Sequence, residues 1–529
     1  MLYRSRARDQ WSKTVLRRSA RALEWLSEKF GRYPYPQLSV VQGLLAGGME
    51  YPMLVMNSSE RESLILHEVG HIYFYGILAN NEWQEAWLDE GFTSFQRRWY
   101  MESRYGKWGF DREAMLKSGT LLQRVRPAMT SREQNIEAVL AYMNSGHNEP
   151  ISKPAYAYEG PVGYSRNAYT KGAFFYDMLK YVVGDENFDK ICKAYFQRWK
   201  FKHVNKARFQ EVCEEISGLD LNWFFDQWLD QAVTIDYGLA RVEKDRADSL
   251  WQTQVYVVKM EQGTMPVEVQ LTTLTGDTLV QRWDGLEKVG RVDFQTAGEP
   301  DQVILDPRDA ILDNSRFNNQ PLKARVMFDY PNMTYRPRDA LLFTWRPSGW
   351  YNNVDKLRIG GRLRGWQARQ KSAEFGVWYG VHSNILDARV NYSNQIKALG
   401  PGSQGSLLIE KMEGRMEFDA SLSFVKSRNL SSSPKHKIRF GLNHSKLLNG
   451  DARLYTLREF NNTLIPTWSK GTVNKAYARY SVNPRGLTWF ANLGLGVESV
   501  QEDWGSDFTF NAISGELKFW SVLGTNGFH

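Results

Sequence analysis

The spacing of apolar residues changes along this chain, and this change constrains the fold more than any other feature. Up to about Gln231 apolar residues recur every three or four positions, which predicts helices. After Asp236 the spacing falls to two, which is typical of half-buried strands. The predicted helices include 20–30, 63–79, 171–183 and 206–216. A short apolar run at 38–41 predicts a strand within the helical part, which makes that part α+β.

The last two hundred residues alternate polar and apolar positions most strictly. In 356–364, Leu357, Ile359 and Leu363 share one face and basic residues share the other. The segments 372–382, in which Trp378 is the one exception, 417–424 and 487–497 follow the same rule. About ten such segments, each followed by a polar turn, predict an antiparallel β-barrel-like region, apolar toward lipid and charged toward a wet lumen. A soluble antiparallel sheet also alternates and remains an alternative.

Three domains are therefore expected in a chain of 529 residues, which is too long for one core. We predict an α+β domain at 1–235 and a small β-sandwich at 236–322, where short strands are separated by Gly-Asp and Asp-Pro turns. The β-barrel-like region then covers 323–529, after a linker near 318–321. Because residues 526–529 do not end on the terminal aromatic of a closed bacterial barrel, we expect a fragment with an incomplete barrel.

Composition excludes several classes of protein. The net charge of +8 comes from scattered Lys and Arg, so no nucleic-acid partner is predicted. No run of 18 apolar residues exists and the first 30 residues lack the apolar region of a signal peptide, so the protein is cytosolic or its true start is missing. Cys192 and Cys213 do not form a zinc-ribbon pattern. Two buried free thiols are predicted, with a disulfide open as an alternative in an exported protein.

The residues that carry chemistry begin with His-Glu-Val-Gly-His at 67–71, inside an apolar-periodic helix. Two histidines four apart project from one face and can bind one metal ion, and Glu68 on the flank can reach a water. Glu90 follows His71 after 18 residues, which allows a second helix to return beside the first. Two imidazoles and a carboxylate leave zinc an open position, so His67, His71 and Glu90 predict one catalytic Zn²⁺ per chain. If the motif at 67–71 is taken alone, the alternative to metal binding is a helix that carries two unrelated histidines by chance.

These residues, with Trp-Leu-Asp-Glu-Gly-Phe at 87–92, resemble the gluzincin zinc aminopeptidases of the aminopeptidase N and leukotriene hydrolase type. The resemblance includes 30–36 and 47–52, similar to the segment with the family's glycine-x-Met-Glu-Asn motif. It implies a thermolysin-like catalytic domain in which Glu50 binds the free α-amino group of a peptide. The substrate-binding residues that it implies are Gly47, Gly48, Met49 and Glu50. Tyr51 stands where the family has Asn, which leaves fine substrate positioning open.

The sequence Tyr-Thr-Lys-Gly-Ala at 169–173 resembles a second segment of the same family. The resemblance implies that Tyr169 donates a hydrogen bond to the developing oxyanion, while Glu68 accepts a proton from water. Tyr164 is expected to line the same cleft. The implied reaction is removal of N-terminal amino acids from peptides with a free N-terminus.

A shorter resemblance places the chain in a cell envelope. Residues 350–360 are similar to the opening strand of outer-membrane surface-antigen barrels. This implies an aminopeptidase of the outer membrane or periplasm of a Gram-negative bacterium, with an outer-membrane contact through the C-terminal region. Two alternatives remain, a cytoplasmic aminopeptidase with an accessory β-domain, and a catalytically inactive zinc-site protein that acts as a membrane-barrel-associated binding module.

Overall fold

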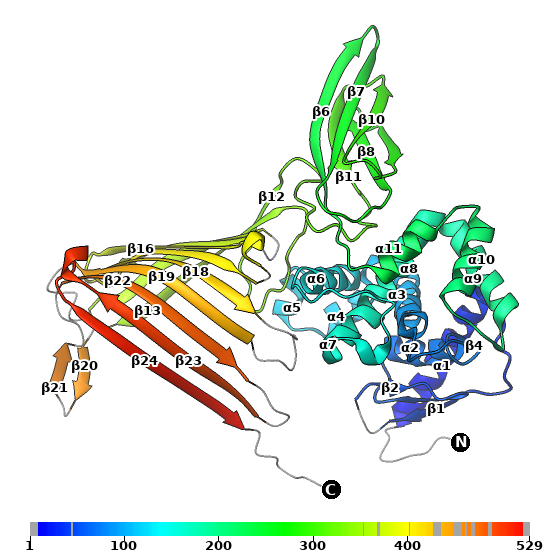
Figure 1. The fold of residues 1–529 in the computed structure, drawn as a ribbon, viewed down its shortest axis with the longest axis horizontal. Helices are drawn as coiled ribbons and strands as arrows, with labels where there is room; N and C mark the ends of the chain where they lie inside the picture. Colours follow the sequence, from blue (N-terminus) through cyan, green and yellow to red (C-terminus); the bar gives the residue numbers. More distant parts are fainter. Residues whose placement is uncertain are drawn as a thin grey trace. The chain divides into compact units, whose positions relative to one another are not determined.

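In the computed structural model the chain folds into two compact units. Figure 1 shows the course of the chain. The first unit comprises Met1–Met143 and His147–Pro321, and the second comprises Leu322–His529 with the short segment Asn144–Gly146. The described residues are 9–43, 46–352, 354–367, 371–400, 402–426, 435–448, 457–460, 463–466, 471–484 and 489–521. The expectation about the chain end at 526–529 therefore lies outside the described residues.

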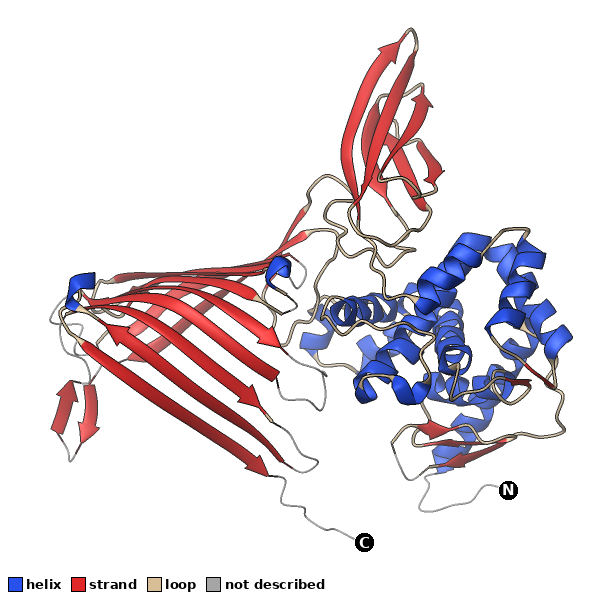
Figure 2. Cartoon of the chain, viewed as in Figure 1, coloured by secondary structure: helices blue, strands red, loops and turns tan. Residues whose placement is uncertain are grey.

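Helices make up most of the first unit before the sandwich strands (Figure 2). Aromatic side chains fill its core, where the rings of Phe74 and Phe92 stack with centroids 3.9 Å apart. Cys192 and Cys213 are buried free thiols, as predicted. The helices are α1 (Asp9–Lys29), α2 (Glu62–Tyr73), α3 (Phe92–Tyr105), α4 (Arg112–Ser118), α5 (Leu121–Val125), α6 (Ser131–Met143), α7 (Gly160–Tyr164), α8 (Gly172–Val183), α9 (Asp185–Trp199), α10 (Lys206–Ser217) and α11 (Asn222–Asp230).

One predicted helix is too long. The apolar run at 63–79 predicted a single helix, whereas α2 ends at Tyr73 and β4 (Leu78–Ala79) follows. Tyr75 has a φ of 125°, which a helix does not accommodate. Leu78 and Ala79 instead pair in parallel with β5 (Lys202–His203). Because the end of α2 and β4 are both largely buried, apolar residues continue from one to the other. Their spacing therefore did not show where the helix ends.

Two groups of strands complete the first unit. The predicted strand at 38–41 is β1 (Ser39–Gln42), which pairs in parallel with β3 (Leu54–Asn57), and β2 (Gly48–Met49) pairs antiparallel with β3. Two three-stranded sheets lie in the segment for which a small β-sandwich is predicted. One holds β6 (Tyr237–Ala247), β7 (Leu250–Lys259) and β10 (Val289–Thr296), and the other β8 (Val267–Thr273), β9 (Thr278–Trp283) and β11 (Pro300–Leu305).

The second unit is built on one eleven-stranded sheet. Its neighbours pair antiparallel, except that β12 pairs in parallel with β13. In spatial order the strands are β12 (Ala324–Phe328), β13 (Leu341–Asn352), β14 (Lys356–Gln367), β15 (Lys371–Gly380), β16 (Leu386–Gln395), β17 (Gln404–Met412), β18 (Arg415–Lys426), β19 (Lys435–Leu447), β22 (Thr472–Asn483), β23 (Trp489–Val500) and β24 (Phe510–Ser521). A separate hairpin joins β20 (Leu457–Phe460) and β21 (Thr463–Pro466).

Burial in this sheet is the reverse of that in an ordinary soluble sheet. Leu357 and Ile359 are 50% and 49% exposed, whereas Arg358 between them is 0% exposed. The Arg358 guanidinium lies against the carboxylates of Asp355 and Asp387, both fully buried. Trp378, the exception in the predicted alternation, is buried, and its Nε1–H donates to Ser348 Oγ at 2.6 Å. The sheet therefore covers its charged face and exposes its apolar face.

The sheet is open within the described residues. Its edge strands β12 and β24 do not pair with each other there, so the region predicted to be an incomplete antiparallel barrel is a sheet that does not close into a barrel. Strand alternation specifies faces and neighbours but carries no information on whether the two edges meet. In the part of the chain that the structure describes, no helix has the length and apolar character needed to cross a membrane.

Candidate metal centre and active site

Helix α2 presents the two predicted histidine ligands on one face. Because the helix is buried on nearly every side, His67 and His71 are held in the core of the first unit. Their Nε2 atoms are 3.3 Å apart. The start of the helix is anchored by Glu62, whose carboxylate accepts hydrogen bonds from the hydroxyls of Tyr100 at 2.5 Å and Tyr105 at 2.6 Å.

Glu90 reaches the same point from a π-helical turn, η1 (Trp87–Gly91). Its Oε2 lies 3.4 Å from His67 Nε2 and 3.3 Å from His71 Nε2, and it accepts no hydrogen bond although it is buried. Donor atoms about 2.0–2.1 Å from a tetrahedral zinc ion are about 3.3 Å apart. Three lone-pair donors at that mutual spacing fit a zinc ion that keeps a fourth position open.

Asp89 orients one of these ligands. Since His71 Nε2 faces the donor cluster, its proton is on Nδ1, and this N–H donates to Asp89 Oδ1 at 2.5 Å. A carboxylate behind a histidine ligand sets the tautomer and raises the basicity of the ligand nitrogen. Sequence reasoning missed Asp89, although a second carboxylate next to Glu90 was the available signal.

Replacing Asp89 with Asn should weaken zinc binding by about 10–100-fold, since the neutral amide stabilises the ligating tautomer less. The zinc dissociation constant, measured by competition with a chromophoric chelator, tests this. Asp301→Asn, at an exposed position on β11, is the matched control. Equal zinc affinity in Asp89→Asn and wild type would contradict the orienting role.

Glu68 lies beside the donor cluster and against β2. A Cβ added at Gly48 would overlap the Glu68 carboxyl group, so a side chain at this position would displace that group. Burial raises the pKa of Glu68 to about 8, and neighbouring carboxylates add to this shift. A carboxylate with this pKa is suited to accept a proton near neutral pH.

The other residues of the 47–50 segment lie at the edge of the same site. A carboxylate oxygen of Glu50 lies within 4.8 Å of ligand atoms of both His71 and Asp89. Gly47 has a φ of 95°, which glycine adopts without strain, and its N–H donates to Ser58 Oγ at 3.1 Å. Met49 is partly exposed and pairs with Met56 on β3.

Tyr169 comes from a second π-helical turn, η4 (Ser165–Lys171), which packs on η1. A Cβ added at Gly91 would lie 3.0 Å from Ala168 O, and one at Gly172 would lie 3.0 Å from Gly91 Cα, so the backbones of the two turns touch. This contact brings the Tyr169 hydroxyl onto Glu90, to which it donates a hydrogen bond. The ring of Tyr164 packs edge-on against Tyr169 with centroids 5.7 Å apart.

Lys171 is buried beneath this turn. Its Nζ donates to Asn148 Oδ1 at 2.9 Å and to Glu149 O at 2.7 Å, which ties η4 to the loop after α6. Burial lowers the pKa of the Lys171 ammonium to about 7. Lysine in an unfolded chain has a pKa of about 10.4, so the unfolded state binds more protons at pH values between these two.

Wild type should therefore gain stability relative to Lys171→Met as the pH rises from 7 toward 10, by about 2 kcal/mol between pH 7 and pH 9. Below pH 7 the full cost of burying the ammonium is present, and above pH 10 it is absent. Urea unfolding of both proteins at a series of pH values measures the difference. Lys153→Met removes a more exposed lysine that is paired with Glu149 and should show no such slope.

The segment that holds the site is similar to known proteins. Residues 15–228 match the family model of the Peptidase family M1 domain. Aminopeptidase B of Mus musculus is 30% identical over 204 residues, which cover 35% of this chain and 29% of that protein. Aminopeptidase N of Lactococcus lactis subsp. lactis is 24% identical over 290 residues, which cover 51% of this chain and 31% of that protein. The chain thus spans about three tenths of the length of these relatives.

Among solved structures, Legionella pneumophila aminopeptidase A in complex with aspartic acid is similar over 57% of this chain and 34% of its own, with a TM-score of 0.41 and 16% identity. The M1 zinc metallopeptidase from Deinococcus radiodurans is similar over 40% of this chain and 43% of its own, with a TM-score of 0.31 and 22% identity. The segment that matches the family model of the Peptidase family M1 domain, residues 15–228, holds every residue of the site.

Proposed function

We propose that the protein is a zinc-dependent aminopeptidase, a hydrolase that removes N-terminal amino acids from peptides. The observation that carries the proposal is the convergence of three buried metal donors with the carboxylates of Glu68 and Glu50 in one site. The matched family domain and the aminopeptidase relatives support it. His67, His71 and Glu90 would hold the zinc ion.

When bound, zinc acts as a Lewis acid that lowers the pKa of water and polarises the peptide carbonyl. Glu68 accepts the proton that the attacking water loses, and returns it to the departing amine. Tyr169 redirects its hydroxyl from Glu90 to the oxygen on which negative charge develops. Glu50 binds the α-ammonium of the first residue through a charge-assisted hydrogen bond, which restricts cleavage to the first peptide bond.

Hydrolysis of amino-acid 4-nitroanilides, with N-acetylated substrates as controls, tests this function. We expect turnover only of substrates with a free amine, its loss after chelation, and its recovery when zinc is returned. A folded, zinc-loaded protein that turns over none of a panel of such substrates would contradict the proposal. Equal turnover of acetylated and free substrates would contradict the role of Glu50.

We further infer that the C-terminal sheet contacts the hydrocarbon of a Gram-negative outer membrane. Exposed apolar side chains continue from strand to strand over its apolar face, among them Ile359 on β14, Phe440 and Leu442 on β19, and Leu517 on β24. Within the eleven-stranded sheet, the ten strands from β13 to β24 have from 9 to 13 residues, as β17 and β19 illustrate. Membrane-spanning strands need about 9–11 residues. Charged residues buried on the opposite face match the wet side of such a sheet.

Flotation with phospholipid vesicles in a density gradient tests the membrane contact. The full chain should float with the vesicles and should aggregate in buffer without detergent. Leu442→Asp with Phe440→Asp should reduce flotation, whereas Ser445→Asp, on the polar face of the same strand, should not. A monodisperse protein that stays at the bottom of the gradient would contradict the inference and favour a soluble accessory domain.

A further inference from the structure

The polar face of the C-terminal sheet contains a hollow that is rich in basic side chains. It lies over β19, β22, β23 and β24 and has a volume of about 340 Å³. This is within the range of about 300–1,000 Å³ that is usual for small-ligand sites. The polar side chains that line it are Lys437, Arg439, Arg479, Ser481, Ser514 and Glu516. We call this site the basic hollow.

Strand register places like charges directly opposite each other here. Arg439 on β19 is the cross-strand partner of Arg479 on β22. Lys437 lies two residues before Arg439, so it is on the same face of the sheet. Like charges in opposed positions destabilise a strand pair unless an opposite charge compensates them. Three cations therefore line the same hollow on one face of the sheet.

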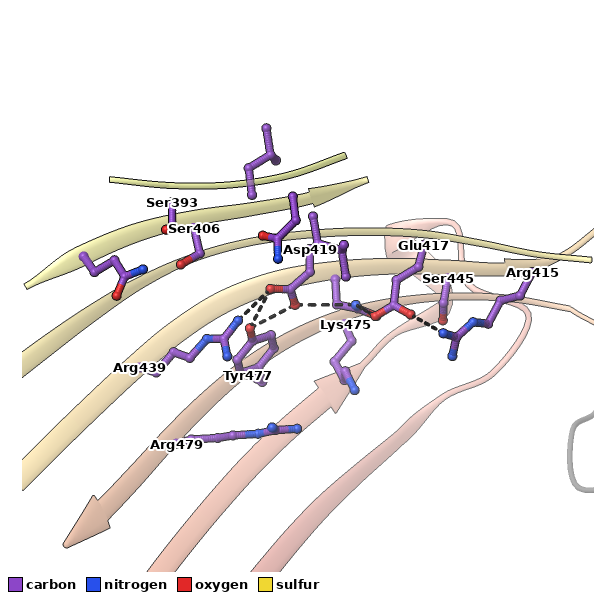
Figure 3. Close-up of a pocket in the computed structure, with 15 residues that line it drawn as sticks. Ser393, Ser406, Arg415, Glu417, Asp419, Arg439, Ser445, Lys475, Tyr477 and Arg479 are labelled. Atoms are coloured by element: carbon purple, nitrogen blue, oxygen red, sulfur yellow. Dashed lines mark hydrogen bonds and ion pairs between the residues drawn. The ribbon is translucent and has the colours of Figure 1, made fainter. Parts of the chain in front are cut away.

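The nearby carboxylates compensate only one of these three charges, that of Arg439. Asp419 accepts hydrogen bonds from Arg439 and from the Tyr477 hydroxyl, both at 2.9 Å (Figure 3). Glu516 is paired with Lys518. Among the described residues, Lys437 and Arg479 have no carboxylate within ion-pair distance, and the Arg479 guanidinium lies 5.2 Å from the centroid of the Tyr477 ring. Two positive charges remain uncompensated.

Small residues leave the space beside these cations open. Arg479 pairs with Gly496 and Ser481 pairs with Gly494 on β23, so no side chain from that strand fills the hollow. The next strand brings Ser514, opposite Gly496. The serine hydroxyls of β22 and β24 add uncharged hydrogen-bond donors to the guanidinium and ammonium groups.

From these observations we propose that the basic hollow binds a phosphate group. A phosphate monoester carries a charge of about −1.5 to −2 at pH 7, which matches the two uncompensated cations. Arginine presents paired N–H donors that suit phosphate oxygens, and both serines can donate to the same group. A ligand with a single carboxylate, by contrast, would leave one of the two cations uncompensated. The site is independent of the peptidase centre, so either proposal can fail without the other.

Calorimetric titration of inorganic phosphate into the full chain, held in a nonionic detergent at low salt, tests the site. Wild type should bind phosphate, and Arg479→Gln and Lys437→Gln should each weaken binding by about tenfold or more, since each removes a charge-assisted hydrogen bond. Lys475→Gln is the matched control, because Lys475 is on the same face of β22 but is paired with Glu498 at 3.2 Å. It should leave phosphate binding unchanged.

A second arm identifies the source of the phosphate group. If short-chain phosphatidic acid binds and inorganic phosphate does not, and Arg479→Gln removes this binding, the phosphate site is supported and its ligand is a lipid headgroup. Binding of neither probe to wild type would overturn the proposal. Phosphate binding that is equal in wild type, Arg479→Gln and Lys437→Gln would also overturn it.

Stability provides a readout that does not depend on ligand titration. In phosphate-free buffer of low ionic strength, Arg479→Gln should raise the melting temperature, because it removes one of two opposed cations. Phosphate should raise the melting temperature of wild type and have little effect on that of Arg479→Gln. A phosphate-induced shift of equal size in both proteins would contradict the site.

Discussion

Replacing Glu68 with Gln should lower kcat for an amino-acid 4-nitroanilide by about 10²–10⁴-fold, which is the usual contribution of a positioned general base. The amide keeps the shape of the side chain beside Gly48 but cannot accept the proton of the attacking water. Steady-state kinetics at saturating substrate measure the change in kcat. Because Glu68 is not one of the three donors at the metal centre, zinc content should be unchanged.

Zinc content and KM are the controls for this result. A variant that is inactive because it has lost its zinc would show a metal-binding defect and would say nothing about proton transfer. If Glu68→Gln retains its zinc and more than about a tenth of the wild-type kcat, another group must accept the proton. The proposed mechanism would then be wrong at its central step.

Tyr169→Phe is expected to lower kcat by about 10²–10³-fold, the loss that follows removal of one donor to a developing oxyanion. In the structure this hydroxyl donates to Glu90, so it already lies beside the metal donors. KM should change much less than kcat, because the interaction with substrate oxygen strengthens only as charge develops. Both parameters come from the same 4-nitroanilide assay.

Tyr156→Phe is the matched control, since Tyr156 is 63% exposed and forms no part of the donor cluster. It should behave as wild type. An unchanged kcat with a raised KM in Tyr169→Phe would mean that the hydroxyl serves ground-state binding only. Lost zinc in that variant would instead assign the tyrosine to support of Glu90.

Glu68 and Tyr169 reach the metal donors in different ways. Glu68 follows His67 within one helix, so its place beside the donors was already implied by helical geometry. Tyr169 is 79 positions from Glu90, and its role in the sequence analysis rested on resemblance alone. The structure adds the physical reason for its position, namely the close contact of Gly91 with the 168–172 backbone.

What the sequence by itself determined was local. A spacing of four places two histidines on one helix face, and a period of two assigns side chains to opposite faces of a strand, because both depend only on the geometry of adjacent residues. The His67–His71 pair and the alternation in β14 could therefore be predicted. The shared apolar spacing of a buried helix and a buried strand hid the end of α2 at Tyr73.

Only the tertiary structure decided what depends on contacts between distant segments. The support of His71 by Asp89 and the fit of Gly48 against Glu68 are of this kind. The opposed pair Arg439 and Arg479 is another, since it exists only because β19 and β22 adopt one register. Residue spacing along a chain does not show which strands pair or how closely two backbones approach each other. Strand pairing sets the charges at the basic hollow, and backbone approach sets the distances at the metal centre.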